Sequence, residues 1–339
     1  MKDYRGLVRL VAGMALAMTT LFPLAATGAA PGYTLVTATP GGTYYPVGVA
    51  LSTLTRVKLR PHGEAWLAAS QSAGSADNVR RLEDGRAQFA ILQGLFGYYA
   101  WNGIGPVEEP QQNLRAVAVL WMNVDHFTVH SRFVDTGTIA DLTGMAGEPM
   151  AMGSPGSGTI GSNRILLDNL GIDVDGFDLH PAGYGGSATA LIEGEVSGMG
   201  TPAGVPVNAV TRAQIEMGGD AVVLGFTDEQ AAAADGGLGI WTPYTIPAGT
   251  YPAQRESVQT VAQPNLLAVR ADIPEEDVYR ITRAIFDHLS FLQGVHSATE
   301  SMSLDEAMTG LPLPLHPGAA RYYREQGMQI PEHMNPDNL

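Results

Sequence analysis

The chain has 339 residues, a formal net charge of −15 and no cysteine. Apolar residues make up 45% of it and charged residues 16%, a globular composition that excludes a disordered, collagen-like or coiled-coil protein. The negative charge excludes nucleic acid and anionic lipid as bulk partners. The absence of cysteine excludes disulfides and thiolate metal sites, and the length favours two lobes over a single core.

The first thirty residues have the pattern of an export signal. Three basic residues precede an apolar run from Leu10 to Ala26, and small residues continue to Ala30. This pattern predicts a cleavable signal peptide over residues 1–30 and a periplasmic location. A membrane anchor is the alternative, but the run of about 17 residues lies at the short limit for crossing a bilayer.

The rest of the chain alternates strand-like runs with helical patterns. Its first part predicts strands and helices in the order strand 33–38, helix 45–59, strand 67–71, helix 76–83, strand 87–93, and strands 114–121 and 124–130. Its second part predicts a helix start at 138–142, strand 149–152, helix 160–170, helix 187–193, strand 196–200, helix 205–217, strand 221–224, a loop at 244–255, strand 258–270 and helix 275–291. This alternation predicts an α/β fold with a parallel or mixed sheet in each lobe.

The loop from Gly156 to Gly161 fits the pattern G-x-G-x-x-G and lies between a predicted strand and a predicted helix. A dinucleotide could approach such a loop, but the motif normally belongs to the first strand–helix unit, and here several strands precede it. A P-loop would need Lys where Thr159 stands. A smaller anion such as a carboxylate could bind the first-turn N–H groups of Gly158 and the hydroxyls of Ser157 and Thr159. A plain helix cap is the third interpretation.

The loop Pro40–Pro46 also connects a predicted strand to a predicted helix. Gly42 and Thr43 let the backbone approach a ligand closely, and Tyr44 and Tyr45 offer aromatic walls with hydroxyl tips. The alternative is a tight turn with packed tyrosines.

A third helix opening, Ser72–Asn78, is rich in hydroxyl groups. Ser72 and Ser75 could bind a ligand there, and Ser75 is also the expected helix cap. An ordinary cap would explain this segment equally well.

Motifs of common enzymes are missing from the chain. It contains no G-x-S-x-G, no H-E-x-x-H and no EF-hand loop. His126 and His130 are four residues apart, but they fall on a predicted strand, so we expect no metal site. Glycines and hydroxyls at several helix starts, without a nucleophile, base or metal, indicate a binding protein and not an enzyme, with no cofactor.

Several motifs in one order give the chain a family resemblance. They are Gly41–Gly48, Gly74–Leu82, Phe89–Gln93, Asn113–Leu120, Asp141–Gly144, Gly153–Thr159 and Ala190–Val196. The chain resembles the TAXI family, the TRAP-associated extracytoplasmic immunogenic proteins, over nearly all of its length after the signal. The resemblance implies a solute receptor of a TRAP transporter, with two α/β lobes joined by crossing strands and a ligand in the cleft between them.

Two departures from the family pattern concern the ligand. Characterised members are associated with glutamate, glutamine or 2-oxoglutarate, and the strand ending in Gln is commonly followed by Ser or Asn and then Asp. Here Gly94 and Leu95 follow Gln93, and Val196–Gly198 replaces the family's Ile-Asp-Ala. If the missing acid held an ammonium group, its loss favours a 2-oxo acid or dicarboxylate.

The sequence therefore predicts a two-lobed fold like that of type II periplasmic binding proteins, with a mixed sheet flanked by helices in each lobe. Lobe one is expected to comprise 31–122 and 260–339, and lobe two 125–255. We expect a monomer that captures a small carboxylate (a 2-oxo acid, a dicarboxylate or a glutamate-like ligand) and delivers it to TRAP membrane subunits. The predicted ligand-binding residues are Gly42, Thr43, Tyr44, Tyr45, Ser72, Ser75, Gln93, Ser157, Gly158 and Thr159.

Two other classes of function remain as alternatives. The first is a periplasmic α/β enzyme that binds a nucleotide cofactor with the loop Gly156–Gly161. The second is a structural or adhesive surface protein, which would bind no small molecule saturably.

Overall fold

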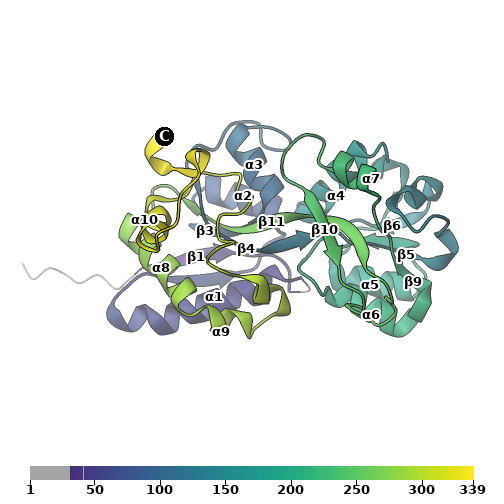
Figure 1. Ribbon diagram of the computed structural model, residues 1–339, viewed down its shortest axis with the longest axis horizontal. Helices are drawn as coiled ribbons and strands as arrows, with labels where there is room; N and C mark the ends of the chain where they lie inside the picture. Colours follow the sequence, from purple (N-terminus) through teal and green to yellow (C-terminus); the bar gives the residue numbers. More distant parts are fainter. Residues whose placement is uncertain (1–30, 41) are drawn as a thin grey trace, which may run out of the picture.

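Two β-sheets, each flanked by helices, organise the chain into two lobes (Figure 1). The structure is a computed structural model that describes residues 31–40 and 42–339. The predicted signal peptide, residues 1–30, and Gly41 lie outside the described residues. We call the part around the first sheet lobe one and the part around the second sheet lobe two, and the mixed α/β fold predicted from the sequence is confirmed.

The sheet of lobe one has six strands in the order β10-β11-β3-β1-β2, with β4 paired to β11. The strands are β1 (Gly32–Val36), β2 (Trp66–Ser70), β3 (Phe89–Gln93), β4 (Leu114–Val124), β10 (Thr242–Ile246) and β11 (Val258–Arg270). β1 is parallel to β2 and β3, whereas β11 is antiparallel to β3, β4 and β10. The carboxyl ends of the parallel strands therefore meet at one edge, where loops of α/β proteins bind ligands.

Six helices cover this sheet: α1 (Tyr44–Lys58), α2 (Ser75–Glu83), α3 (Gly94–Asn102), α8 (Glu275–Asp287), α9 (Leu289–Gln293) and α10 (Pro317–Glu325). α1, α8 and α9 lie on one side of the sheet, with α2 and α3 on the other (Figure 1). The single helix predicted over 275–291 is wrong, because the helix ends at Asp287 and a second one begins at Leu289. Both α8 and α10 contact β4, so the end of the chain packs on lobe one.

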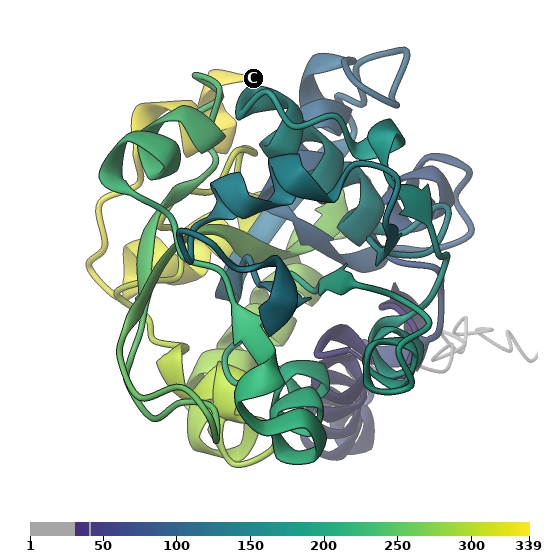
Figure 2. The same ribbon diagram turned by 90° about the vertical axis from the view of Figure 1, so that its right-hand side faces the viewer.

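The sheet of lobe two has five strands in the order β7-β6-β8-β5-β9. They are β5 (Phe127–His130), β6 (Pro149–Ala151), β7 (Asp178–Leu179), β8 (Gly198–Gly200) and β9 (Ala221–Val223), with helices α4 (Gly158–Asn169), α5 (Tyr184–Ile192), α6 (Asn208–Met217) and α7 (Asp228–Ala234) around them. α4 and α7 lie on one face and α5 and α6 on the other (Figures 1 and 2). The helix start predicted at 138–142 is a 3-10 helix, Ile139–Met145.

Other short 3-10 helices connect these elements, at Arg60–His62, Ser131–Phe133, Val174–Gly176, Gly218–Asp220, Ser297–Ser301, Glu332–Met334 and Pro336–Asn338.

The chain crosses between the lobes twice. β4 continues to Val124, beyond the predicted end of its strand, and β5 begins two residues after Asp125. The second crossing is the long strand β11, whose first residues pair with β10. The loop predicted over 244–255 is wrong at its start, because β10 extends to Ile246. Pro243 of β10 suits the edge of the sheet, where β10 lies, because proline cannot donate a hydrogen bond to a second neighbouring strand. β10 falls in the range predicted for lobe two, 125–255, although it pairs with β11 in the sheet of lobe one, and the residue bounds of the lobes stay a prediction.

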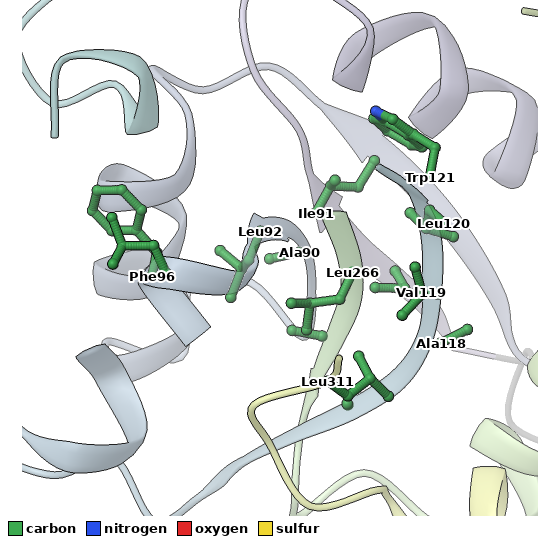
Figure 3. Packing of buried hydrophobic residues seen from close by; sticks show 14 of the residues in the cluster. Ala90, Ile91, Leu92, Phe96, Ala118, Val119, Leu120, Trp121, Leu266 and Leu311 are labelled. Atoms are coloured by element: carbon green, nitrogen blue, oxygen red, sulfur yellow. The ribbon is translucent and has the colours of Figure 1, made fainter. Parts of the chain in front are cut away.

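The apolar core of lobe one fixes the strand ends that carry the site. Figure 3 shows side chains from β3 (Ala90–Leu92), β4 (Ala118–Trp121) and β11 (Leu266) gathered together, with Phe96 of α3 beside them. These residues are buried, and burial of each large one contributes about 1.5–3 kcal/mol. Gln93 follows Leu92 directly, and Trp121 is the last residue of the packed segment of β4. The backbone that carries both side chains is therefore held in place by the core.

Candidate ligand-binding site between the lobes

A cavity of about 120 Å³ lies between the two lobes. Eight of the ten predicted site residues line it, namely Gly42, Thr43, Tyr44, Ser75, Gln93, Ser157, Gly158 and Thr159. The rest of the lining is Ala38, Thr39, Ala73, Gly74, Trp121, Asn123, Gly153, Ser154, Ala182, Gly183, Tyr184, Pro202 and Ala203. The structure therefore brings together three loops that are far apart in the sequence.

The other two predicted residues, Tyr45 and Ser72, do not line the cavity. Tyr45 follows Tyr44 on α1, and successive helical side chains point about 100° apart. The hydroxyl of Ser72 donates to the carbonyl oxygen of Thr37 (2.9 Å) and accepts from the N–H of Gly74 (3.2 Å). Ser72 therefore shapes the loop before α2.

Four helices begin at the cavity. Their first residues are Tyr44 of α1, Ser75 of α2, Gly158 of α4 and Tyr184 of α5, and all four line it. Ser75 is the first helical residue and not the predicted cap, since Gly74 is the N-cap with φ of 123°, a conformation that favours glycine. First-turn N–H groups and the helix dipole place partial positive charge at each start.

The described part of the lining contains no Asp, Glu, Lys, Arg or His. The first turns of α1, α4 and α5 also contain no acidic residue. In α2, Asp77 is engaged elsewhere: it accepts from the N–H of Ala73 and forms an ion pair with Arg81 at 2.7 Å. The potential in the cavity therefore comes from backbone dipoles and neutral side chains.

Three buried polar atoms in the lining have no hydrogen-bond partner among the described residues. They are Oε1 of Gln93, Nε1 of Trp121 and Nδ2 of Asn123, on side chains whose residues are at most 3% exposed. Leaving such an atom unpaired costs about 1–3 kcal/mol. All three residues line the cavity, although the three atoms themselves have almost no accessible surface.

A chain of hydrogen bonds orients Asn123. The hydroxyl of Tyr44 donates to Oδ1 of Asn265 (2.6 Å), and Nδ2 of Asn265 donates to Oδ1 of Asn123 (3.2 Å). Burial raises the pKa of Tyr44, so its hydroxyl stays protonated and donates. The oxygen of Asn123 is thereby occupied, and its N–H₂ group is left for a ligand.

In lobe two, Tyr184 completes the wall of the cavity. Its hydroxyl donates to the carbonyl oxygen of Pro202 and pairs with the hydroxyl of Thr159 at 3.1 Å. Burial raises the pKa of Tyr184. The Ser157 hydroxyl donates to Ser154 O (2.7 Å) and accepts from the Ile160 N–H (3.4 Å). Ser157 is therefore a helix cap whose hydroxyl is already engaged.

The glycines of the G-x-G-x-x-G loop lie where lobe two contacts lobe one. A Cβ added at Gly158 would lie 2.7 Å from Oε1 of Gln93, and one at Gly161 would lie 2.7 Å from Cζ of Phe96. Neither close approach would be possible with a larger residue. The contact between the lobes thus accounts for both glycines without a nucleotide.

Sequence reasoning missed Trp121, Asn123 and Tyr184 as members of the site. A signal for Asn123 was present, because it is a polar residue inside an otherwise apolar run that forms β4. The departure noted at Leu95 does not bear on the lining, since Leu95 is fully buried outside the cavity.

In residues 31–40 and 42–339, no three His, Cys, Asp or Glu side chains cluster as they would to hold a metal ion. Within the same ranges, no helix is both long enough and apolar enough to cross a bilayer.

The fold, two lobes with a cavity between them, is that of periplasmic binding proteins. Similar solved structures include MatC from Rhodopseudomonas palustris with bound malate (15% identity, TM-score 0.51, covering 79% of this chain and 88% of that one). The periplasmic binding protein BugD is similar as well (13% identity, TM-score 0.51, 88% and 94% covered). So is a protein from Bordetella bronchiseptica (14% identity, TM-score 0.50, 91% of each chain covered).

A family model described as the NMT1-like family matches residues 35–327. The chain belongs to this family.

Proposed function

We propose that the protein is a periplasmic receptor that binds a small carboxylate between its lobes and delivers it to the membrane subunits of a TRAP transporter. One observation carries the proposal: helix N-termini from both lobes surround a cavity whose described lining has no charged side chain, and two residues of that lining, Trp121 and Asn123, carry buried N–H donors without a partner. We infer from this lining that the protein binds and does not catalyse.

A carboxylate matches this lining chemically. It accepts hydrogen bonds with both oxygens, and each hydrogen bond to a charged group contributes about 1.5–3 kcal/mol. The positive ends of α1, α2, α4 and α5 favour the same charge. Oε1 of Gln93 then remains for a hydroxyl or another donor on the ligand.

The size and the missing acids narrow the ligand further. Since one water needs roughly 10–15 Å³ of such a cavity, 120 Å³ suits a small acid better than a dinucleotide. An ammonium group would be buried without any carboxylate in the lining, which is costly. We therefore propose a 2-oxo acid or a dicarboxylate, without an obligatory amine.

The transporter type rests on the sequence resemblance described above. Export fits the signal pattern of residues 1–30, and delivery requires a receptor that opens and closes. The division into lobe one (31–122 and 260–339) and lobe two (125–255) forms part of this proposal, with closure about the two crossings.

Thermal shift and calorimetry test the proposal. The mature protein is screened against dicarboxylates, 2-oxo acids and amino acids, because a ligand at 100 times its Kd adds about 2.7 kcal/mol of stability. We expect saturable binding of 2-oxoglutarate or a dicarboxylate. Glutamate binding at least tenfold tighter than 2-oxoglutarate, a difference of about 1.4 kcal/mol in binding free energy, would contradict the proposal that the ligand needs no amine. A response to NAD alone would favour the nucleotide enzyme, and no saturable response would favour a structural protein.

A further inference from the structure

A second concave surface lies on lobe one, away from the ligand cavity. It is a groove of about 270 Å³ between the end of α1 and the start of α9, lined by Thr53, Leu54, Val57, Lys58, His288, Ser290 and Phe291. Val57 is 62% exposed and Phe291 is 43% exposed. α1 and α9 lie next to each other on one side of the molecule (Figure 1). We call this groove, together with Arg56 and Arg60, which neighbour Lys58 in the sequence, the α1–α9 surface.

The α1–α9 surface is basic in a strongly acidic protein. Arg56, Lys58 and Arg60 lie within five residues and are exposed, and the ion pairs found among the described residues include none of them. The guanidinium groups of Arg56 and Arg60 lie 5.7 and 5.5 Å from the ring centre of Trp66. Both cations are therefore held in place by a cation–π contact.

The acidic residues near this surface leave its charge uncompensated. Glu64 follows Arg60 in the chain but pairs with Arg280 of α8. Asp287 precedes His288 and is the one exposed carboxylate next to the groove in sequence. Lys58 in the groove and its neighbours Arg56 and Arg60 are thus cations without an ion pair among the described residues, on a chain whose net charge is −15.

We propose that the α1–α9 surface docks an acidic amphipathic segment of the transporter's membrane subunits. This inference rests on the proposed function. Apolar side chains of the segment would enter the groove against Val57 and Phe291, and its carboxylates would face Lys58, Arg56 and Arg60. Complementary charge of this kind raises the rate of encounter and selects the orientation of docking.

Two other occupants fit the surface less well. A flat lipid surface cannot fill a concave groove, and the net negative charge of the chain opposes an anionic membrane. In a symmetric pair of copies, each α1–α9 surface would face the same three cations of the other. An acidic protein segment meets neither objection.

Uptake into proteoliposomes that contain the purified membrane subunits tests the docking. The variant Lys58→Glu/Arg60→Glu is compared with Arg132→Glu/Arg255→Glu, which reverses two exposed cations of lobe two and gives the same net charge. Both variants must unfold at the wild-type temperature and bind the carboxylate found in the screen with unchanged Kd. We expect the first variant to need at least tenfold more protein for half-maximal uptake, and the control less than twofold more.

A second variant tests the groove itself. Val57→Ser/Phe291→Ser, which leaves all charges in place, should also raise the half-maximal concentration, by at least fivefold. Equal uptake by wild type, charge variant and groove variant would overturn the inference. Flotation of the protein with anionic vesicles that lack the subunits would also overturn it, because lipid would then be the occupant. The same holds for a wild-type dimer that Lys58→Glu/Arg60→Glu converts to monomers. If the wild type itself drives no uptake, the proposed function fails, and this result is distinct from a failure of the docking surface.

Discussion

Trp121 lines the cavity, and its single polar atom, Nε1, has no hydrogen-bond partner among the described residues. Its ring makes an edge contact with Tyr44 at 5.7 Å between centres, so packing holds the indole in place while its N–H stays available. The indole N–H can only donate. Replacing Trp121 by Phe removes this donor together with part of the buried ring.

Replacing Trp121 by Phe should weaken carboxylate binding about tenfold or more, because one hydrogen bond to a charged group contributes about 1.5–3 kcal/mol. Calorimetry with the carboxylate found in the screen measures the change in Kd. Trp101→Phe serves as the control, since Trp101 lies on α3 outside the cavity. An unchanged Kd for Trp121→Phe would mean that the ligand does not contact this N–H.

Asp125 is a buried acid in the crossing between β4 and β5. Its Oδ2 accepts from Nε1 of Trp241 (2.9 Å), and its backbone carbonyl accepts from the hydroxyl of Thr260 (2.7 Å). Burial raises the pKa of Asp125 to about 8, although the hydrogen bond from Trp241 lowers it. The folded protein therefore holds a neutral Asp125 below this pH.

Stability should fall as the pH rises from 6.5 to 8. The unfolded carboxyl is already ionised there, so folding takes up a proton, and each pH unit costs up to about 1.4 kcal/mol. Burial lowers the pKa of His126 and of His316 to about 4, so those two groups reduce stability only below about pH 6.5.

Urea unfolding of wild type and Asp125→Asn at pH 6.5 and 8 measures this effect. We expect the free energy of unfolding of the wild type to fall by up to about 2 kcal/mol more than that of the variant. The same pH dependence in both proteins would show that Asp125 titrates outside this window.

At the scale of elements, helix α4 of lobe two contacts lobe one through the face that carries Gly158 and Gly161. Gly158 and Gly161 lie on adjacent turns, and they face Gln93 and Phe96 of lobe one. A methyl group at either position would collide in this arrangement, yet an alanine suits the helix itself better by roughly 1 kcal/mol. Alanine at Gly158 or Gly161 should therefore hinder contact between the lobes while it stabilises the helix.

The variant Gly161→Ala should lower ligand affinity at least tenfold without lowering the unfolding temperature of the ligand-free protein. Its Cβ would lie 2.7 Å from Phe96, so the lobes could not reach their observed contact. Gly185→Ala is the matched control on α5, since no heavy atom lies within 4 Å of its added Cβ. Adding Phe96→Leu to Gly161→Ala should restore affinity, and failure of this rescue would contradict a steric cause.

Local sequence patterns predicted some of these elements better than others. α8 follows a proline and alternates its faces clearly, and its start at Glu275 was predicted correctly. α3 was missed because two glycines and buried residues on nearly all sides hide its period. α10 was missed too, and nothing in the structure explains why.

The site was predictable only where the chain itself provides the geometry. Glycines and hydroxyls at helix starts indicated Gly42, Ser75 and Gly158 correctly as lining residues. Asn123 stood out only as a polar residue in an apolar run, and its orientation was not predictable because it depends on Asn265, which lies 142 residues later. Contacts between distant segments leave no local pattern.

At the scale of the whole molecule, the lobes touch on both sides of the cavity. A Cβ at Gly42 would lie 3.7 Å from Tyr184, and one at Gly74 would lie 3.3 Å from the backbone nitrogen of Gly158. These contacts join residues of the two lobes, and we call the arrangement in which they touch the closed form.

Binding should shift the protein toward this closed form. Small-angle X-ray scattering is expected to give a smaller radius of gyration with saturating carboxylate than without it, and wild type should respond more than Gly161→Ala. Identical radii with and without ligand would mean that the lobes do not move about the crossings.

The position of β11 also determines when the chain can fold. β11 lies between β3 and β4, and within the described sheet it is the strand that pairs with β4. During synthesis, the first 257 residues therefore emerge before lobe one can complete its sheet. A truncated protein ending at residue 256 should remain protease-sensitive and melt without a cooperative transition, whereas a sharp transition would show that β3 and β4 fold without it.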